Sequence, residues 1–193
     1  MRIILARHGE PDMVGFNSKN NKSYGEWLKK YNSSGIKKES NPPTELLTFA
    51  KKCDVIFSSN LKRAVDSVYK LDTGNKIITD KVFREFELPD NKKQYPKFTP
   101  DIWSVIFRIL WFVGYSNKNE NFADAKKRIK LSVEKLLNAA ETNSDILLVG
   151  HGLMNKFIGM ELKRTGWKRT GNKGRGYWSY SEYSKLSHKS VHL

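Results

Sequence analysis

The chain alternates short runs of consecutive apolar residues with longer segments in which apolar residues recur every three or four positions. The runs predict strands at 3–6, 54–59, 76–79 and 145–150, and an alternation of aromatic and polar residues predicts a further strand at 176–187. The segments with helical period predict helices at 24–31, 45–52, 61–71, 101–115, 122–141 and 153–164. Because strands and helices follow one another in turn, we expect an α/β fold whose mainly parallel sheet is covered by helices on both faces.

Two polar segments interrupt this pattern and are expected to be loops. Residues 12–40 are rich in Asn, Ser, Lys and Gly outside the helix at 24–31, and residues 91–100 contain two prolines and several lysines. Loops of this length in compact domains usually carry function. Asn60 is expected to cap the helix at 61–71. The chain shows no internal repeat and no domain boundary, so we expect residues 1–193 to form a single domain.

The composition is that of a globular protein with a strong excess of positive charge. The 193 residues are 38% hydrophobic and 28% charged, and 35 Lys and Arg against 20 Asp and Glu give a formal net charge of +15. Such a charge attracts nucleic acid, phosphorylated metabolites or an acidic membrane surface, and it does not select among them.

Cysteine usage and the first residues bear on the compartment. Cys53 is the single cysteine, so an internal disulfide is excluded and a reducing compartment is expected. No signal peptide precedes the first strand, and we therefore expect a cytoplasmic protein.

Neither a catalytic cysteine nor a metal site is expected. Cys53 is expected to be a packed or surface thiol rather than a catalytic one. The cysteine and histidine spacings suggest no metal site.

The segment 102–113 is the most apolar part of the chain. Arg108 interrupts it, and it is shorter than the roughly 20 residues that a membrane-spanning helix needs, so no membrane association is expected. As a helix it places Trp103, Phe107 and Trp111 on one face. This face could pack into the core, wall a substrate pocket or form a homodimer contact, and the sequence does not separate these roles.

Basic and polar residues follow three of the predicted strands. Arg7 and His8 end the first strand, and His151 with Gly152 ends the strand at 145–150. The strand at 54–59 ends in Ser58 and Ser59, and Asn60 follows it. Arg63 lies one turn into the next helix. Because the carboxyl ends of parallel strands meet at one edge of a sheet, these side chains are expected to converge there.

Two arginines and two histidines in one place suit phosphoryl transfer. A guanidinium binds phosphate oxygens bidentately and keeps its charge at any working pH. A neutral imidazole is a good nucleophile, and a second, protonated imidazole can donate to a phosphoryl oxygen. The helix that begins after Gly152 is expected to add the positive end of its dipole.

Three motifs resemble the histidine phosphatase superfamily, also called the phosphoglycerate mutase-like family. They are Arg7-His8-Gly9-Glu10, Ser58-Ser59-Asn60-Leu61-Lys62-Arg63-Ala64 and Gly150-His151-Gly152, in the family's order, and the resemblance runs from residue 1 to about residue 165. It implies a three-layer α/β/α domain with a mixed, mostly parallel sheet. It also implies that His8 is phosphorylated during the reaction and that Arg7, Arg63 and His151 bind the phosphoryl group.

The family also uses a carboxylic acid that protonates the leaving group, often in a Leu-x-Glu segment midway along the chain. Phe83-Arg84-Glu85 resembles that segment, so the resemblance implies that Glu85 is the general acid. Glu87 and Asp90 are the alternatives, because all three carboxylates lie within six residues of one another.

Departures from the family pattern favour a phosphatase over a mutase. Pro11 and Val14 stand where many members have Thr and then Asn, so the phosphate contact of that Asn is missing or is made by another residue such as Asn17. We see no insertion of the kind that binds a bisphosphate cofactor in mutases, and we expect neither cofactor nor metal. The prediction is a phosphomonoester hydrolase acting through phosphohistidine on a small phosphorylated substrate. A cofactor-dependent phosphoglycerate mutase and a basic binding protein with reduced catalysis are the alternatives.

The basic stretch 163–175, which carries Trp167 and three glycines, lies outside these motifs. It could bind nucleic acid through phosphate contacts and stacking, form a solvated loop, or supply charge near the mouth of the phosphate pocket. We favour the solvated loop, with nucleic-acid binding no more than non-specific. His188 and His192 are expected to be solvated.

Overall fold

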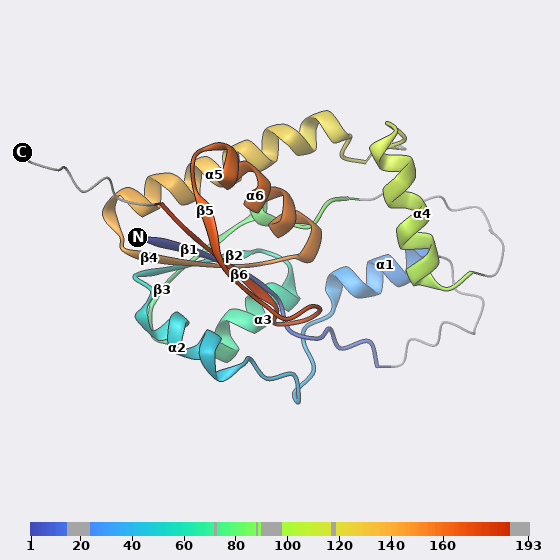
Figure 1. Cartoon of the computed structure of the whole chain (residues 1–193). Helices are drawn as coiled ribbons and strands as arrows, with labels where there is room; N and C mark the ends of the chain where they lie inside the picture. Colours follow the sequence, from blue (N-terminus) through green and yellow to red (C-terminus); the bar gives the residue numbers. More distant parts are fainter. Residues whose placement is uncertain (15–23, 72, 88, 90–97, 117–118, 186–193) are drawn as a thin grey trace, which may run out of the picture.

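The computed structural model describes residues 1–14, 24–71, 73–87, 89, 98–116 and 119–185, without the side chains of Pro100 and Asp101. These residues form a six-stranded sheet of order β3-β2-β4-β1-β6-β5 (Figure 1). The strands are β1 (Arg2–Arg7), β2 (Val55–Ser59), β3 (Lys76–Asp80), β4 (Asp145–Gly150), β5 (Lys168–Lys173) and β6 (Tyr180–Ser184). The first four run parallel, β6 is antiparallel to β1, and β5 is antiparallel to β6. The expected mixed, mostly parallel sheet is confirmed.

The two central strands are buried on both faces. Residues 3–6 of β1 and 146–149 of β4 are each at most 3% exposed. They pair in register, from Ile3 with Ile146 to Ala6 with Val149. A parallel strand with helices on both faces needs an apolar side chain at every position, and the sequence shows such runs here.

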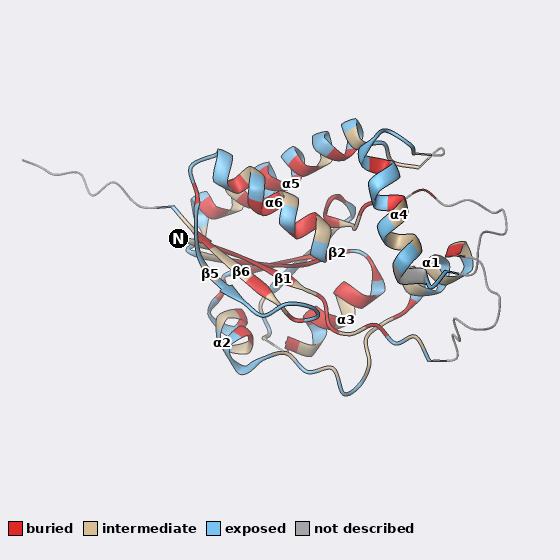
Figure 2. Ribbon diagram, turned by 45° about the vertical axis from the view of Figure 1, so that its right-hand side comes forward, coloured by how far each residue is buried: buried red, intermediate tan, exposed pale blue. Residues whose placement is uncertain are grey.

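Helices cover the two faces of the sheet (Figure 1). On one face lie α5 (Phe122–Thr142) and α6 (Gly152–Arg164), and on the other lie α2 (Thr44–Lys52) and α3 (Lys62–Leu71). Their buried residues face the strands and their exposed residues face outward (Figure 2). Leu136 and Ile158 belong to one core cluster, and Leu46 and Val68 belong to the other. Burial of each such side chain contributes about 1.5–3 kcal/mol. The expected three-layer arrangement is therefore confirmed.

Two further helices, α1 (Tyr24–Ser33) and α4 (Pro100–Phe112), lie beyond the end of the sheet at which the parallel strands finish (Figure 1). Phe107 and Trp111 of α4 are buried, whereas Val105 and Ile109 are 53% and 59% exposed. The apolar segment is thus a helix with only one face packed. None of the helices among the described residues is long and apolar enough to cross a membrane.

The prediction of a solvated loop for the whole basic stretch 163–175 was wrong, because residues Lys168–Lys173 form the edge strand β5. Five of its six residues are exposed, so the strand needs no apolar alternation, and its sequence carries none. The strand predicted at 176–187 is shorter, since β6 covers only Tyr180–Ser184.

The predicted helix cap at Asn60 was also wrong. The helix α3 begins at Lys62, and the backbone N–H of Leu61 is bound by Ser59 Oγ at 3.2 Å. This bond between residues i and i+2 is a serine turn that precedes the helix. Ser59 thereby ties the end of β2 to the start of the helix that carries Arg63.

Candidate active site

His8 lies directly after β1, at the edge of the sheet where the strands end. Its backbone N–H donates to Gly150 O at 3.0 Å, and its carbonyl accepts from Trp178 N at 3.3 Å. The chain is therefore held on both sides just beyond the last residue of β1. The side chain is 1% exposed.

The hydrogen bonds of His8 define its tautomer. Arg63 Nε lies 3.2 Å from His8 Nε2, and a guanidinium nitrogen can only donate, so Nε2 is the acceptor. The proton is then on Nδ1, which lies 2.7 Å from Gly9 O. Burial, together with the charges of Arg63 and Arg7, lowers the pKa of His8 from 6.5 to about 3. His8 is thus a neutral imidazole whose Nε2 lone pair faces Arg63.

Arg63 is a buried cation positioned by α1. It is 1% exposed, and its Nη1 donates to Tyr31 O at 3.0 Å and to Asn32 Oδ1 at 3.3 Å. Its guanidinium carbon lies 4.3 Å from the centroid of the Tyr31 ring. These partners are neutral, so the positive charge of Arg63 remains available to an anion.

His151 is completely buried beside His8, with the two ring centroids 5.1 Å apart. Its Nε2 lies 2.8 Å from Ser59 Oγ, the same oxygen that accepts from Leu61 N. Burial is the main cause that lowers the pKa of His151 well below its usual value, followed by the charge of Arg63. The lowered pKa favours a neutral His151, in contrast to the expected protonated second imidazole. A neutral His151 can still donate through Nδ1, which is buried and has no partner among the described residues.

Arg7 lies at the other side of the site, under an aromatic ring. Its guanidinium carbon is 4.5 Å from the centroid of Tyr177, and that ring lies 5.7 Å from the ring of His8. Arg7 Nε is buried and has no partner within the described part of the chain. Arg7 and His151 thus each keep one nitrogen donor that no protein group satisfies.

Tyr177 belongs to the hairpin between β5 and β6, which is anchored next to His8. Trp178 adopts a left-handed backbone conformation, with φ of 59°, and its indole Nε1 donates to Ser40 Oγ at 2.9 Å. A Cβ at Gly9 would lie 2.8 Å from the Trp178 ring. The close approach of this ring to the Arg-His-Gly segment therefore requires glycine at position 9.

The carboxylate of Glu85 caps the first turn of α6. Its Oε1 accepts from Met154 N at 3.0 Å and from Phe86 N at 3.2 Å, and its Oε2 accepts from Leu153 N at 3.3 Å. The N–H groups of Leu153 and Met154, at the positive end of the α6 dipole, are therefore bound to Glu85. Glu87 is exposed, and Asp90 lies outside the described residues.

A cavity of about 790 Å³ brings these groups together. Arg7, His8, Arg63 and Glu85 all line it, and so do Glu87 and Gly152. Trp27 and Tyr31 of α1 line it too, and so do Val105 and Arg108 of α4. The aromatic face of α4 does not line the cavity, because Phe107 and Trp111 are buried in the core and Trp103 packs against it. A cavity of this size accommodates a small phosphorylated molecule.

A sequence profile of the histidine phosphatase superfamily (branch 1) matches residues 3–184. The chain belongs to the histidine phosphatase superfamily. No curated protein sequence matches this chain significantly.

Solved structures of phosphatases have a similar fold. A mycobacterial glucosyl-3-phosphoglycerate phosphatase in complex with VO3 is 20% identical, with 94% of this chain and 90% of that chain covered and a TM-score of 0.61. A phosphoserine phosphatase of Entamoeba histolytica in complex with 3-phosphoglyceric acid is 15% identical, with 94% and 89% covered and a TM-score of 0.56. An alpha-ribazole phosphatase from Shigella flexneri is 16% identical, with 84% and 79% covered and a TM-score of 0.53. At these identities the likeness establishes the shared fold.

In this superfamily member the segment that carries Glu85 is held by an ion pair that the sequence did not suggest. Both Nε and Nη2 of Arg128 lie 2.6 Å from the Glu120 carboxylate. Arg128 Nη1 donates to Val82 O at 3.0 Å and to Arg84 O at 2.7 Å. Arg128 therefore fixes the backbone on both sides of Phe83, just before Glu85.

The positions that depart from the family pattern lie away from the phosphoryl site or outside the described residues. Val14 is 77% exposed, and Pro11 pairs with Ile36 in an isolated bridge. Asn17 lies outside the described residues. The asparagine that reaches Arg63 is Asn32, and its place in a long polar segment gave no signal for this contact.

The remaining candidates lie outside the site. Cys53 is buried at the end of α2, and burial raises the pKa of its thiol to about 12, so it stays protonated. No group of three or more His, Cys, Asp or Glu side chains that could hold a metal ion occurs among the described residues. His188 and His192 are not among those residues.

Proposed function

We propose that the chain is a phosphomonoester hydrolase that acts through a phosphohistidine on Nε2 of His8. The observation that carries the proposal is the hydrogen bond from Arg63 Nε to His8 Nε2 inside a cavity lined by cations. It keeps a neutral, nucleophilic nitrogen next to a group that binds phosphate oxygens.

Substrate binding begins with the positive groups of the site. The phosphoryl oxygens are bound by Arg7, Arg63 and the Nδ1–H of His151. Arg7 Nε and His151 Nδ1 are buried and have no partner among the described residues, which suits such a ligand. A phosphoryl oxygen then takes over the Arg63 Nε–H, and this releases the lone pair of His8 Nε2. The preorganised positive charge stabilises the charge that spreads over the phosphoryl group in the transition state.

Chemistry then proceeds in two displacements. His8 Nε2 attacks phosphorus in line, the N–P bond forms as the bond to the leaving oxygen breaks, and Glu85 gives its proton to that oxygen. Water next attacks the phosphohistidine, Glu85 takes a proton from it, and the N–P bond breaks to return His8 and release phosphate. Each group ends the cycle in its starting state.

The test is to trap the intermediate. Rapid quench with a ³²P-labelled phosphomonoester should yield an acid-labile, alkali-stable phosphoprotein in the wild type and none in His8→Ala. Lys62→Ala, on the exposed side of α3 next to Arg63, is the control and should form it normally. Near-normal turnover by His8→Ala would refute the mechanism. Phosphoryl transfer to 3-phosphoglycerate in preference to water would instead indicate a mutase.

A further inference from the structure

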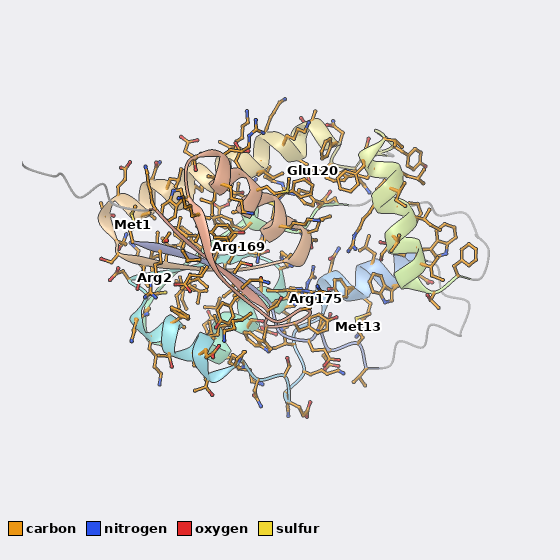
Figure 3. All side chains as sticks on the ribbon, viewed as in Figure 1. Met1, Arg2, Met13, Glu120, Arg169 and Arg175 are labelled. Atoms are coloured by element: carbon orange, nitrogen blue, oxygen red, sulfur yellow. The ribbon has the colours of Figure 1, made fainter. Side chains whose placement is uncertain are left out.

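A second cleft lies between α6 and the β5–β6 hairpin, which are in contact with one another. We call it the α6–β5 cleft. Its volume is about 270 Å³, and its basic residues are Lys156 and Lys163 of α6, Arg169 of β5 and Arg7 at the end of β1. Arg169 is labelled in Figure 3, on the strand at the edge of the sheet. The two lysines are seven residues apart and so lie on one side of the helix.

The positive charge of this cleft is not compensated. Within the described part of the chain, Lys156, Lys163 and Arg169 make no ion pair and no hydrogen bond, and no carboxylate lines the cleft. The nearby carboxylates are bound elsewhere: Glu161 lies 3.8 Å from Arg164, and Glu182 lies 3.3 Å from Arg2.

The four positive charges of Arg7, Lys156, Lys163 and Arg169 repel each other, and an anion placed between them offsets that repulsion. The lysines provide mobile point charges, while Arg169 offers the planar fork that matches a tetrahedral oxyanion. The cleft also contains the polar side chains of Asn172, Ser179 and Ser181. Its volume suits a single phosphoryl group better than a nucleic-acid strand, which needs an extended basic groove and exposed aromatic platforms.

We propose that the α6–β5 cleft is a second oxyanion site that binds a phosphate-type group, either free inorganic phosphate or the phosphoryl end of a small metabolite. It lies beside the phosphoryl site at His8, and Arg7 stands between the two. The basic stretch that the family resemblance left unexplained supplies part of it, through Lys163 and Arg169.

The two sites share a wall. Arg7 and Gly152 line both the cavity around His8 and the α6–β5 cleft. An anion in the cleft lowers the positive potential at Arg7 and should weaken the binding of a phosphorylated substrate at His8. Because linkage is reciprocal, a substrate bound at His8 should weaken anion binding in the cleft by the same factor. This coupling rests on the proposed function, whereas binding in the cleft does not.

The test locates phosphate by NMR. ¹⁵N-labelled protein is titrated with inorganic phosphate at fixed ionic strength, because salt screens exposed charges. We expect saturable shifts in the amides of β5, β6 and α6, in addition to those around His8. In Lys156→Gln/Lys163→Gln/Arg169→Gln the affinity at the cleft should fall at least about tenfold, the loss expected for charge-assisted hydrogen bonds. The charge-matched control Lys51→Gln/Lys76→Gln/Lys130→Gln, exposed positions on α2, β3 and α5, should retain it.

Further titrations separate the sources of the anion. Methylphosphonate binding as tightly as phosphate would indicate a phosphorylated metabolite, and its rejection would indicate free phosphate; both outcomes support the oxyanion site. Absence of saturable shifts at the cleft, or equal affinity in the triple variant, would overturn the proposal. So would tighter binding of single-stranded DNA there at physiological salt. Failure of the proposed function alone would leave the cleft shifts intact and remove only those around His8.

Discussion

Arg63 donates its Nε–H to Nε2 of His8 at 3.2 Å, so a permanent cation is hydrogen-bonded to the proposed nucleophile. Burial, and after it the charge of Arg63, lowers the pKa of His8 by disfavouring the imidazolium form. The environment that keeps His8 neutral for the proposed chemistry therefore also makes the stability of the fold depend on pH.

Stability should fall on acidification because of His8. The pKa of His8 is about 3 in the folded protein and near 6.5 when unperturbed, so between these values the unfolded chain binds more protons. The free energy of unfolding then decreases as the pH is lowered, by at most about 1.4 kcal/mol per pH unit for each such group. Urea unfolding between pH 7 and 5 should show a shallower dependence in His8→Gln than in the wild type. Identical slopes would contradict the lowered pKa.

Glu85→Gln should bind phosphate but turn over slowly, because the side chain keeps its size and loses its transferable proton. The loss should be about 10²–10⁴-fold for alkyl phosphates and smaller for aryl phosphates, whose leaving group needs little protonation. Steady-state kinetics on both substrates provide the measurement. Glu87→Gln, at an exposed position of the same cavity, is the control and should change either rate little. Equal losses on the two substrates in Glu85→Gln would exclude Glu85 as the general acid.

Arg128→Lys should impair the same step without touching the substrate. Lysine keeps the charge but cannot bind Glu120 and the carbonyls of Val82 and Arg84 together, so the segment before Glu85 loosens. We expect kcat to fall about tenfold more for alkyl than for aryl phosphates, with little change in KM. The exposed neighbour Lys127→Met is the control. A uniform loss on both substrates would indicate a general structural role instead.

Ser59→Ala should disturb the tautomer of His151. Because Ser59 Oγ accepts from Leu61 N, its own hydrogen is free for His151 Nε2, which places the imidazole proton on Nδ1. Without the hydroxyl, ¹⁵N NMR of the ring should show a mixture of tautomers, and kcat should fall. Ser59→Thr should restore both. Ser58→Ala, which removes a neighbouring buried hydroxyl, should leave the tautomer unchanged. A pure Nδ1–H tautomer in Ser59→Ala would contradict this role.

The sequence predicted the parts of the site that depend on strand ends. His8, Arg63 and His151 follow β1, β2 and β4, and parallel pairing alone brings such positions to one edge. The packing of Tyr31 on Arg63 and of Tyr177 on Arg7 was not predictable. It depends on a helix inside a long polar segment and on the hairpin of an edge strand.

The sequence also did not predict contacts between side chains and backbone groups that lie far apart in the chain. The carboxylate of Glu85 meets the amides of Leu153 and Met154 across 68 and 69 residues, and no local pattern reports such a contact. The same applies to Arg128, whose helical period shows that it lies on α5 but not that it binds the backbone at residues 82 and 84.

The β5–β6 hairpin, which places Tyr177 over Arg7, pairs with the parallel strands at the edge of the sheet, through β6 and β1, and Trp178 N also donates to His8 O. Residues between Lys173 and Tyr180 can therefore be lengthened, shortened or exchanged without altering the register of the strands that carry His8, Arg63 and His151. Directed evolution of this turn, with Trp178 kept as its anchor, offers a route to new substrate preferences on an unchanged reaction core.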